Sequence, residues 1–217
     1  MSKREQSFKL LVKYYVYLFI VWGFYRLLVF QYPAALEIIL IKPLVWLVPL
    51  YLIIKRENIS YKDLGITNQK LFFSIYFALI LGVIFTFEGV LINFLKYGGR
   101  FEFQSNIGPE PFLIAIALSF ITAFTEEIAF RGYIFTQTQK YLKKEWTANF
   151  ITSIAWTLIH LPIASLDWRL EPANLALYLV LVFTFSVGSS FIFARTKNIS
   201  SSIFLHVLWQ WPIILYR

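Results

Sequence analysis

Two adjacent carboxylates and an arginine interrupt a long apolar stretch of the chain. Glu126, Glu127 and Arg131 lie in a region that is otherwise apolar from about Pro111 to Phe135. Placing a charge at the centre of a bilayer costs at least about 2.5–3.5 kcal/mol on insertion scales, so such residues usually face a cavity or a partner. We therefore interpret this stretch as part of a candidate site.

The spacing of the three charges predicts different roles for them. Glu127 and Arg131 are four residues apart, so they share a helix face and can form an ion pair. Glu126 is rotated by about 100° from Glu127 on the same helix. We expect Arg131 to hold Glu127 in a supporting role and Glu126 to face the interior. Taken alone, the cluster is equally compatible with a buried ion pair that only fixes helix packing.

The chain contains two histidines, and both lie in apolar segments. Trp156 and His160 are four residues apart, as are His206 and Gln210, so each pair faces one direction on its helix. A lone histidine in such a segment is more often a hydrogen-bonded packing residue. Two histidines together with a glutamate pair, on three predicted helices, favour a site.

A carboxylate, two imidazoles and an amide inside a membrane suit hydrolysis. Glu126 can act as a general base on water, and a histidine can share in the proton transfer. The N–H groups of His206 and Gln210 can stabilise an oxyanion. The chain has no cysteine, no G-x-S-x-G pattern and no H-E-x-x-H pattern, so thiol catalysis and these serine and zinc motifs are excluded.

The expected depths of these side chains agree only in part. With about 1.5 Å of rise per residue, Glu126 lies ~16 Å and His160 ~20 Å from the inner edge of the membrane. His206 comes out at only ~9 Å if its helix starts near residue 200. The sequence alone does not remove this difference.

The composition is that of a membrane protein. Of the 217 residues, 59% are hydrophobic and 15% are charged, whereas soluble domains are about 45–50% apolar and about 25% charged. We predict an all-α, polytopic helix bundle that forms one domain over residues 1–217, with a helix pair of unclear role in 1–70 and a catalytic core in 71–217. The expected membrane helices are 10–30, 35–54, 71–95, 111–137, 147–165, 173–194 and 200–216.

The basic residues predict the orientation of this bundle. With the N-terminus inside, 13 lysines and arginines fall in inner segments and four in outer ones, which favours an N-in, C-out topology. The inner set is Lys3, Arg4, Lys9, Lys13, Lys55, Arg56, Lys62, Lys70, Lys140, Lys143, Lys144, Arg195 and Lys197, and the outer set is Lys96, Arg100, Arg169 and Arg217. The net charge of +8 therefore indicates membrane topology, and no nucleic-acid partner is expected.

Four further charges fall inside or near the ends of predicted membrane helices. They are Arg26, Glu37, Lys42 and Glu88. Long side chains near helix ends can reach the interface, and intramembrane charges often pair with one another. We therefore expect structural or interfacial roles for all four.

At these motifs the chain resembles the CPBP family, the intramembrane proteases related to the CAAX prenyl endopeptidase and the bacterial Abi proteins. The E-E-x-x-x-R motif of the family matches residues 126–131. Its F-x-x-x-H motif is matched at His160, with Trp156 in place of phenylalanine. Its H-x-x-x-N motif is matched at His206, with Gln210 in place of asparagine. The resemblance covers about residues 71–217.

The resemblance implies a role for each motif residue. Glu126 would be the catalytic base and His160 would help to activate the water. His206 and Gln210 would bind the oxyanion or an ion, while Glu127, Arg131 and Trp156 would support the site. The family is commonly called metalloprotease, and Glu126, His160 and His206 could hold a divalent metal such as zinc. A metal-free mechanism explains the same residues, and both remain open.

The resemblance also implies a partner and a place. We expect a peptide or lipidated peptide, cut in the cytoplasmic half of the membrane by a multi-pass protein in contact with lipids of a bacterial cell membrane. The substrate and the oligomeric state stay unknown. One alternative is a catalytically weak or inactive bacteriocin self-immunity or peptide-binding protein, because Gln210 departs from the family pattern. A transporter ranks lower, because no inverted repeat or pair of broken helices is present.

Overall fold

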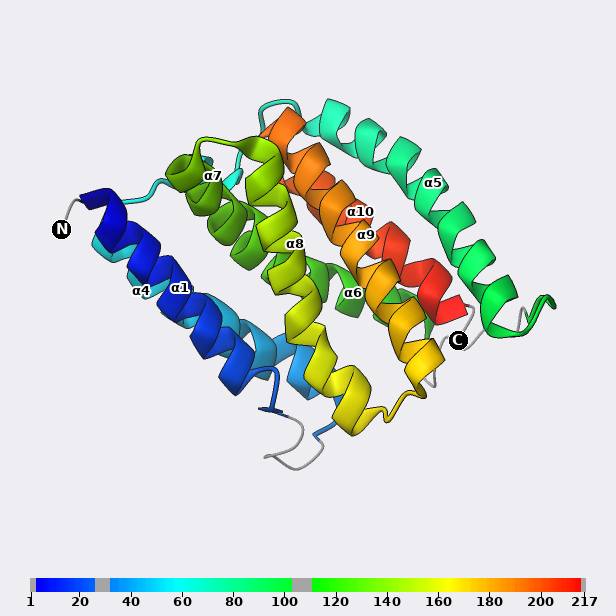
Figure 1. Ribbon diagram of the computed structural model, residues 1–217. Helices are drawn as coiled ribbons and strands as arrows, with labels where there is room; N and C mark the ends of the chain where they lie inside the picture. Colours follow the sequence, from blue (N-terminus) through cyan, green and yellow to red (C-terminus); the bar gives the residue numbers. More distant parts are fainter. Residues whose placement is uncertain (1–2, 26–31, 103–110, 216–217) are drawn as a thin grey trace.

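The chain folds into a bundle of long helices, seen in Figure 1. The computed structural model describes residues 3–25, 32–102 and 111–215. In chain order the α-helices are α1 (Lys3–Val21), α3 (Ala34–Leu36), α4 (Lys42–Glu57), α5 (Leu71–Lys96), α6 (Phe112–Glu127), α7 (Thr136–Leu142), α8 (Glu145–Pro162), α9 (Pro172–Thr196) and α10 (Ile199–Leu215). No strand occurs in these described ranges, which confirms the predicted all-α class.

Five helical segments are long and apolar enough to cross a membrane among the described residues. They are Glu37–Glu57, Leu71–Lys96, Leu113–Leu142, Glu145–Asp167 and Pro172–Thr196. Five of the seven predicted spans thus have a counterpart, and the chain is a multi-pass membrane protein. The helices α1 and α10 do not meet the same criterion, so the count of seven and the N-in orientation stay predictions.

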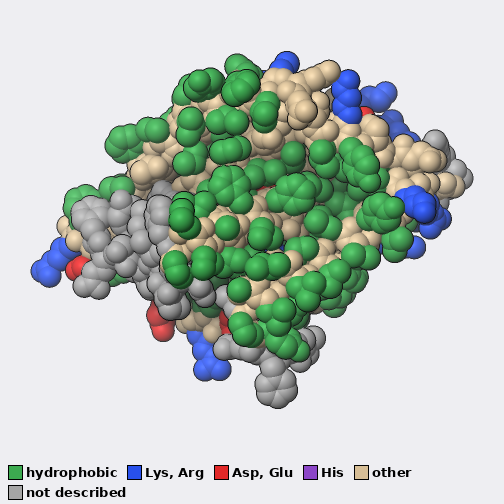
Figure 2. All heavy atoms as spheres, turned by 180° about the vertical axis from the view of Figure 1, so that it is seen from behind, with side chains coloured by type: hydrophobic (Ala, Val, Ile, Leu, Met, Phe, Trp, Pro, Cys, Tyr) green, Lys and Arg blue, Asp and Glu red, His purple; other side chains and the backbone are tan. Residues whose placement is uncertain are grey.

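The outside of the bundle is apolar over a broad area. Figure 2 shows hydrophobic side chains across the middle of one face and lysine and arginine side chains towards its edges. Large apolar residues of the bundle are exposed, and Phe72 and Leu113 are 75% and 76% exposed. A surface of this extent on a soluble monomer would be a site of association. In a membrane it is the surface that meets lipid.

Three of the long helices contain a π-helical segment. These segments are η1 (Glu37–Ile41), η3 (Ile128–Phe135) and η4 (Ile163–Asp167). A proline lies beside two of them, Pro43 after η1 and Pro162 before η4, and a proline has no N–H for the α-helical ladder. The first two segments adjoin Lys42 and Glu127, and η4 begins three residues after His160. Wide π-turns are frequent at functional sites.

The segment of residues 58–70, which we call the 58–70 loop, is held by its own hydrogen bonds. It contains the short 3₁₀ helix η2, Tyr61–Leu64. Ser60 caps this helix, and its hydroxyl donates to Asp63 over 2.8 Å. The bond from the Ser60 side chain holds the pKa of Asp63 below its ordinary value. The loop therefore presents a defined surface to the helices behind it.

The 58–70 loop covers the start of α10. The side-chain amide of Asn198 donates to the carbonyl of Thr67 over 2.8 Å, and the N–H of Ile199 donates to the carbonyl of Gly65 over 2.8 Å. Asn198 is completely buried. The helix α10 thus begins inside the protein rather than at its edge.

This buried start resolves the depth of His206. The sequence-based depth assumed that α10 starts at the membrane edge, whereas the 58–70 loop bonds Asn198 and Ile199 and covers this start. His206 is therefore level with the two glutamates, with its Nδ1 atom 2.7 Å from Glu127 Oε1. The expected difference in depth between His206 and the glutamates is therefore not seen between their side chains.

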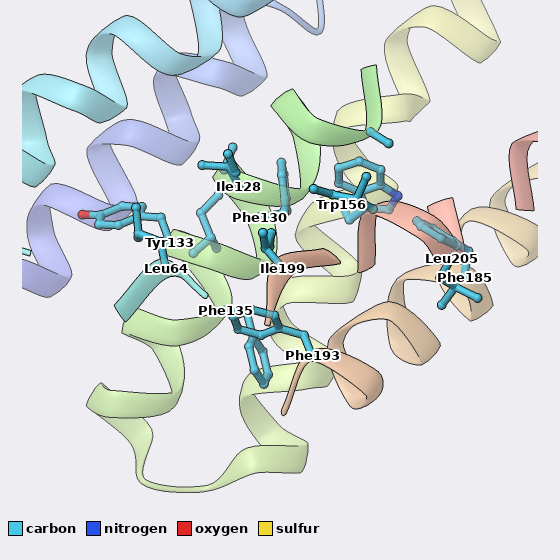
Figure 3. Close-up of a cluster of buried hydrophobic side chains, with 14 of the residues drawn as sticks. Leu64, Ile128, Phe130, Tyr133, Phe135, Trp156, Phe185, Phe193, Ile199 and Leu205 are labelled. Atoms are coloured by element: carbon cyan, nitrogen blue, oxygen red, sulfur yellow. The ribbon is translucent and has the colours of Figure 1, made fainter. Parts of the chain in front are cut away.

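A cluster of buried apolar side chains packs around η3 and is drawn in Figure 3. Phe130 and Phe135 are fully buried, and Phe130 meets Trp156 edge to face with ring centroids 4.7 Å apart. Gly132 faces Leu64 of the 58–70 loop, and a Cβ atom at residue 132 would lie 3.0 Å from the Leu64 carbonyl oxygen. The small residue lets the loop approach the helix that carries the two glutamates.

Candidate active site

The four residues predicted to do chemistry line one cavity. Glu126, His160, His206 and Gln210 all contribute to a cavity of about 390 Å³ between the helices. They come from α6, α8 and α10, so the fold brings together motifs that lie far apart in the sequence. Other parts of the wall come from the residues just after α1, from η1 and the start of α4, and from the first two turns of α9.

Glu127 is the centre of a buried polar network behind this cavity. It is fully buried and accepts a hydrogen bond from Arg131 Nη1 over 3.1 Å and one from Ser189 Oγ over 2.9 Å. Its Oε1 atom also lies 2.7 Å from His206 Nδ1. The predicted pair with Arg131 is present. Glu127 in addition fixes the ring of His206, which the sequence analysis did not foresee.

Arg131 is enclosed by polar and aromatic partners. Its Nη2 donates to the Ser186 hydroxyl over 3.0 Å, and its guanidinium lies over the rings of Trp156 and Phe185 at 4.7 and 5.3 Å from their centroids. A guanidinium over an aromatic face gains electrostatic attraction. Trp156 thus supports the site by packing. Ser186 and Ser189 are members that sequence reasoning missed, because serines on an apolar helix usually indicate close packing.

The hydrogen bonds of the two histidines assign their tautomers. His160 Nδ1 lies 2.8 Å from the carbonyl oxygen of Trp156, and His206 Nδ1 lies 2.7 Å from the Glu127 carboxylate. Both partners are acceptors, so Nδ1 carries the hydrogen in each ring. In the neutral form of each imidazole, the Nε2 atom then has a free lone pair. His206 Nε2 is 3.9 Å from Glu126 Oε2.

Lys42 is a further residue of this site that the sequence did not predict. Its ammonium donates to Glu126 Oε1, and both side chains are almost completely buried. Two indoles flank the ammonium, because it lies 5.3 Å from the ring centroid of Trp22 and 5.7 Å from that of Trp46. No motif spacing links residues 84 positions apart. The only available signal was a lysine within an apolar helix.

The other three intramembrane charged residues are Glu37, Glu88 and Arg26. Glu37 lines the cavity near its rim. Glu88 accepts a hydrogen bond from the Thr184 hydroxyl between α5 and α9, as expected for a structural role. Arg26, for which a structural or interfacial role was expected, lies outside the described residues.

The family model for type II CAAX prenyl endopeptidase Rce1-like proteins matches residues 108–212. This part of the chain belongs to the Rce1-like family. No curated protein and no solved structure matches the chain. The matched range contains α6, α8 and most of α10, with all the predicted motif residues. It supports a CAAX-type intramembrane protease with a peptide substrate in a membrane environment.

Lys42, Trp22 and Trp46 lie outside the Rce1-like match. They belong to α4 and to the segment at the end of α1, for which the sequence analysis found no clear role. In the structure, this N-terminal pair of helices contributes residues to the cavity wall. The candidate site therefore extends beyond the part of the chain that identifies the family.

Gln210, the departure from the family motif, is on the cavity wall. Its Oε1 atom is buried and has no hydrogen-bond partner within the ranges that the structure describes. A buried amide oxygen without a partner is costly. An incoming group with an N–H or O–H donor would satisfy it.

The side chains of this Rce1-like site only partly suit a metal. Glu126 and the Nε2 atoms of His160 and His206 are suitable donors, and each histidine has the kind of second partner that orients metal ligands. However, the described residues contain no group of three His, Cys, Asp or Glu side chains placed to hold an ion. The Lys42 ammonium also lies against the Glu126 carboxylate. This arrangement does not fit zinc, so no step below uses a metal.

Proposed function

We propose that the chain is an intramembrane endopeptidase that hydrolyses a peptide bond with water activated by Glu126. The observation that carries this proposal is the cavity that Glu126, His160, His206 and Gln210 share. A base with an imidazole beside it and an amide opposite is what water attack on a carbonyl requires. Membership of residues 108–212 in the Rce1-like family supports the same reaction class.

In the proposed reaction the water oxygen bonds to the carbonyl carbon of the substrate as Glu126 takes a water proton. The free Nε2 lone pair of His160 accepts a hydrogen bond from the same water and orients it. The amide N–H of Gln210 donates to the oxyanion that forms. The C–N bond then breaks, and the proton held by Glu126 passes to the leaving nitrogen. The products are a carboxylate and an amine.

The other polar residues would position these groups. Glu127 accepts from His206 Nδ1 and keeps its Nε2 atom directed at Glu126. Arg131 balances the charge of Glu127, so that the second carboxylate does not compete as a base. Lys42 keeps Glu126 ionised and in place before water arrives.

The proposal is tested with purified protein in lipid nanodiscs and a library of membrane-spanning and lipidated peptides, read by mass spectrometry. We expect new peptide termini with the wild type and their loss in His160→Gln, which has no imidazole lone pair. Thr157→Ala is a matched control on the same helix, because its hydroxyl donates to the Ser153 carbonyl of its own helix. Absence of cleavage by the wild type, or equal cleavage by His160→Gln, would refute the proposal.

Lys42→Met is expected to destabilise the bundle by about 3 kcal/mol, because it leaves the Glu126 carboxylate buried without its cation. The double variant Lys42→Met/Glu126→Gln should recover at least half of that loss. Reversible unfolding in mixed detergent micelles measures both effects. Losses that simply add in the double variant would mean that the two side chains do not interact.

The ion pair is also the observation that favours the alternative reading, a peptide-binding immunity protein. A carboxylate neutralised by an ammonium is a weaker base, and Gln210 departs from the family motif. In a cell exposed to a membrane-active bacteriocin, protection that survives His160→Ala/His206→Ala would support binding without hydrolysis. Loss of protection in that variant would support the protease.

A further inference from the structure

Much of the cavity wall comes from one end of the bundle. Its wall includes Trp22 at the end of α1, Glu37 at the start of the α4 segment and Trp168 just beyond η4. Tyr178 adds a residue from the first two turns of α9. We call the end of the bundle where these elements meet the rim end, and the opposite end, with the 58–70 loop, the loop end.

The site residues lie at the floor of this cavity. Glu126 is the next-to-last residue of α6, which starts at the rim end, and His160 lies two residues before the end of α8, which runs towards the rim end. Among the described residues that line the cavity, none belongs to the 58–70 loop or to the α7–α8 and α9–α10 connections. The route to the glutamate therefore runs from the rim end.

The distribution of lysine and arginine assigns the two ends of the bundle to different sides of the membrane. All thirteen basic residues of the inner set named above lie on segments of the loop end. The rim end has Lys96, Arg100 and Arg169 among the residues that the structure describes. An excess of lysine and arginine marks the cytoplasmic side of a membrane protein. The loop end is thus the predicted cytoplasmic end.

We infer that the cavity opens to the non-cytoplasmic side of the membrane and that its substrate is a peptide presented on that side. This inference rests on the proposed function for the reaction but not for the direction of access. The sequence analysis expected cleavage in the cytoplasmic half of the membrane. The inference instead places access of the substrate in the opposite half. The substrate class becomes an exported peptide or the outer end of a membrane-inserted one.

The shape and chemistry of the opening agree with such a substrate. A volume of about 390 Å³ is at the lower end of ligand pockets, so a short extended segment enters and a folded domain does not. Trp168 and Tyr178 form an edge-to-face pair near the rim, with centroids 5.4 Å apart. Amphipathic rings of this kind sit at the membrane interface. They provide apolar contact for a peptide that arrives along the outer leaflet.

The absence of cysteine from the sequence allows a direct test, because every single-cysteine variant is free of background labelling. Spheroplasts are treated with a membrane-impermeant sulfonated methanethiosulfonate before or after lysis. Thr122→Cys and Ile38→Cys report on the cavity wall, Leu166→Cys reports on the exposed rim end, and Lys144→Cys reports on the loop end.

We expect Thr122→Cys, Ile38→Cys and Leu166→Cys to react before lysis and Lys144→Cys to react only after it. Reaction of the cavity cysteines only after lysis would overturn the inference, as would their failure to react in either state. Reaction of Lys144→Cys before lysis would mean that the bundle is inverted. Elution of each variant as the wild type does in size-exclusion chromatography verifies folding.

The labelling is repeated in the Glu126→Gln background, where no turnover is needed. An inactive wild type would refute the proposed function and leave the labelling pattern intact. A cytoplasmic labelling pattern with an active wild type would refute the inference alone. The two failures are therefore distinguishable.

Discussion

Glu126→Gln is expected to abolish peptide hydrolysis while the helix bundle stays folded. Glutamine has the shape of glutamate, and its carbonyl oxygen can still accept a hydrogen bond from Lys42, but it cannot take a proton from water. Loss of a general base costs about 10²–10⁴ in rate. The measurement is kcat/KM for a peptide that the wild type cuts, with the unfolding midpoint in detergent measured in parallel.

Glu88→Gln is the matched control for this experiment. It changes another carboxylate within a membrane helix, one that bonds Thr184 between α5 and α9 and does not line the cavity. We expect its kcat/KM to stay within about twofold of the wild type, because it does not touch the reacting atoms. Equal activity of Glu126→Gln and the wild type would remove Glu126 as the base.

Arg131→Met is expected to destabilise the protein by about 3–5 kcal/mol, because removing one partner of a buried ion pair leaves the other charge uncompensated. Arg131 and Glu127 are both fully buried, and the Ser186 hydroxyl also loses its donor. Reversible unfolding in mixed detergent micelles measures the loss. The effect on activity follows from stability, since Arg131 acts through Glu127 and His206.

A second substitution separates the lost charge from the lost packing. Arg131→Met/Glu127→Gln removes both charges, and we expect it to recover several kcal/mol relative to Arg131→Met because no buried carboxylate is left unpaired. A double variant no more stable than Arg131→Met would show that the packing of Arg131 on Trp156 and Phe185 is the larger contribution. A loss below about 1 kcal/mol in the single variant would contradict the predicted ion pair.

Much of the fold could be predicted because a membrane allows few solutions. Apolar segments of the right length must be helices, since every backbone polar group has to bond within its own segment. Five of the seven predicted spans have counterparts for this reason. The π-helical segments could not be predicted, because the periodicity of apolar residues carries no signal for them. They depend on local side-chain packing and, for two of them, on the nearby Pro43 and Pro162.

The candidate site was predictable where its residues share a helix. Glu127 with Arg131, and Trp156 with His160, follow from a spacing of four, and both pairs are in contact. Contacts between helices far apart in the chain have no such signal. Lys42 on Glu126 is one, and His206 on Glu127 is another. These contacts depend on how the helices cross in space, and a single sequence carries no signal for that.

The position of His206 along the bundle is a second feature that the sequence did not predict. Counting residues from a membrane edge assumes that each helix starts at that edge. The helix α10 starts under the 58–70 loop instead, so this assumption does not hold for His206. The signal lies in Asn198, a polar residue that is completely buried because its amide bonds the loop backbone.

The buried start of α10 has a consequence for how the protein is made. The 58–70 loop and the helices that carry Glu126 and His160 are synthesised before α10. The surface against which α10 packs can therefore form before α10 is added. Until α10 docks, His206 is absent, Glu127 lacks one of its donors and the cavity has no wall on that side. The proposed hydrolysis therefore requires docking of α10, the helix that follows the other motif helices in order of synthesis.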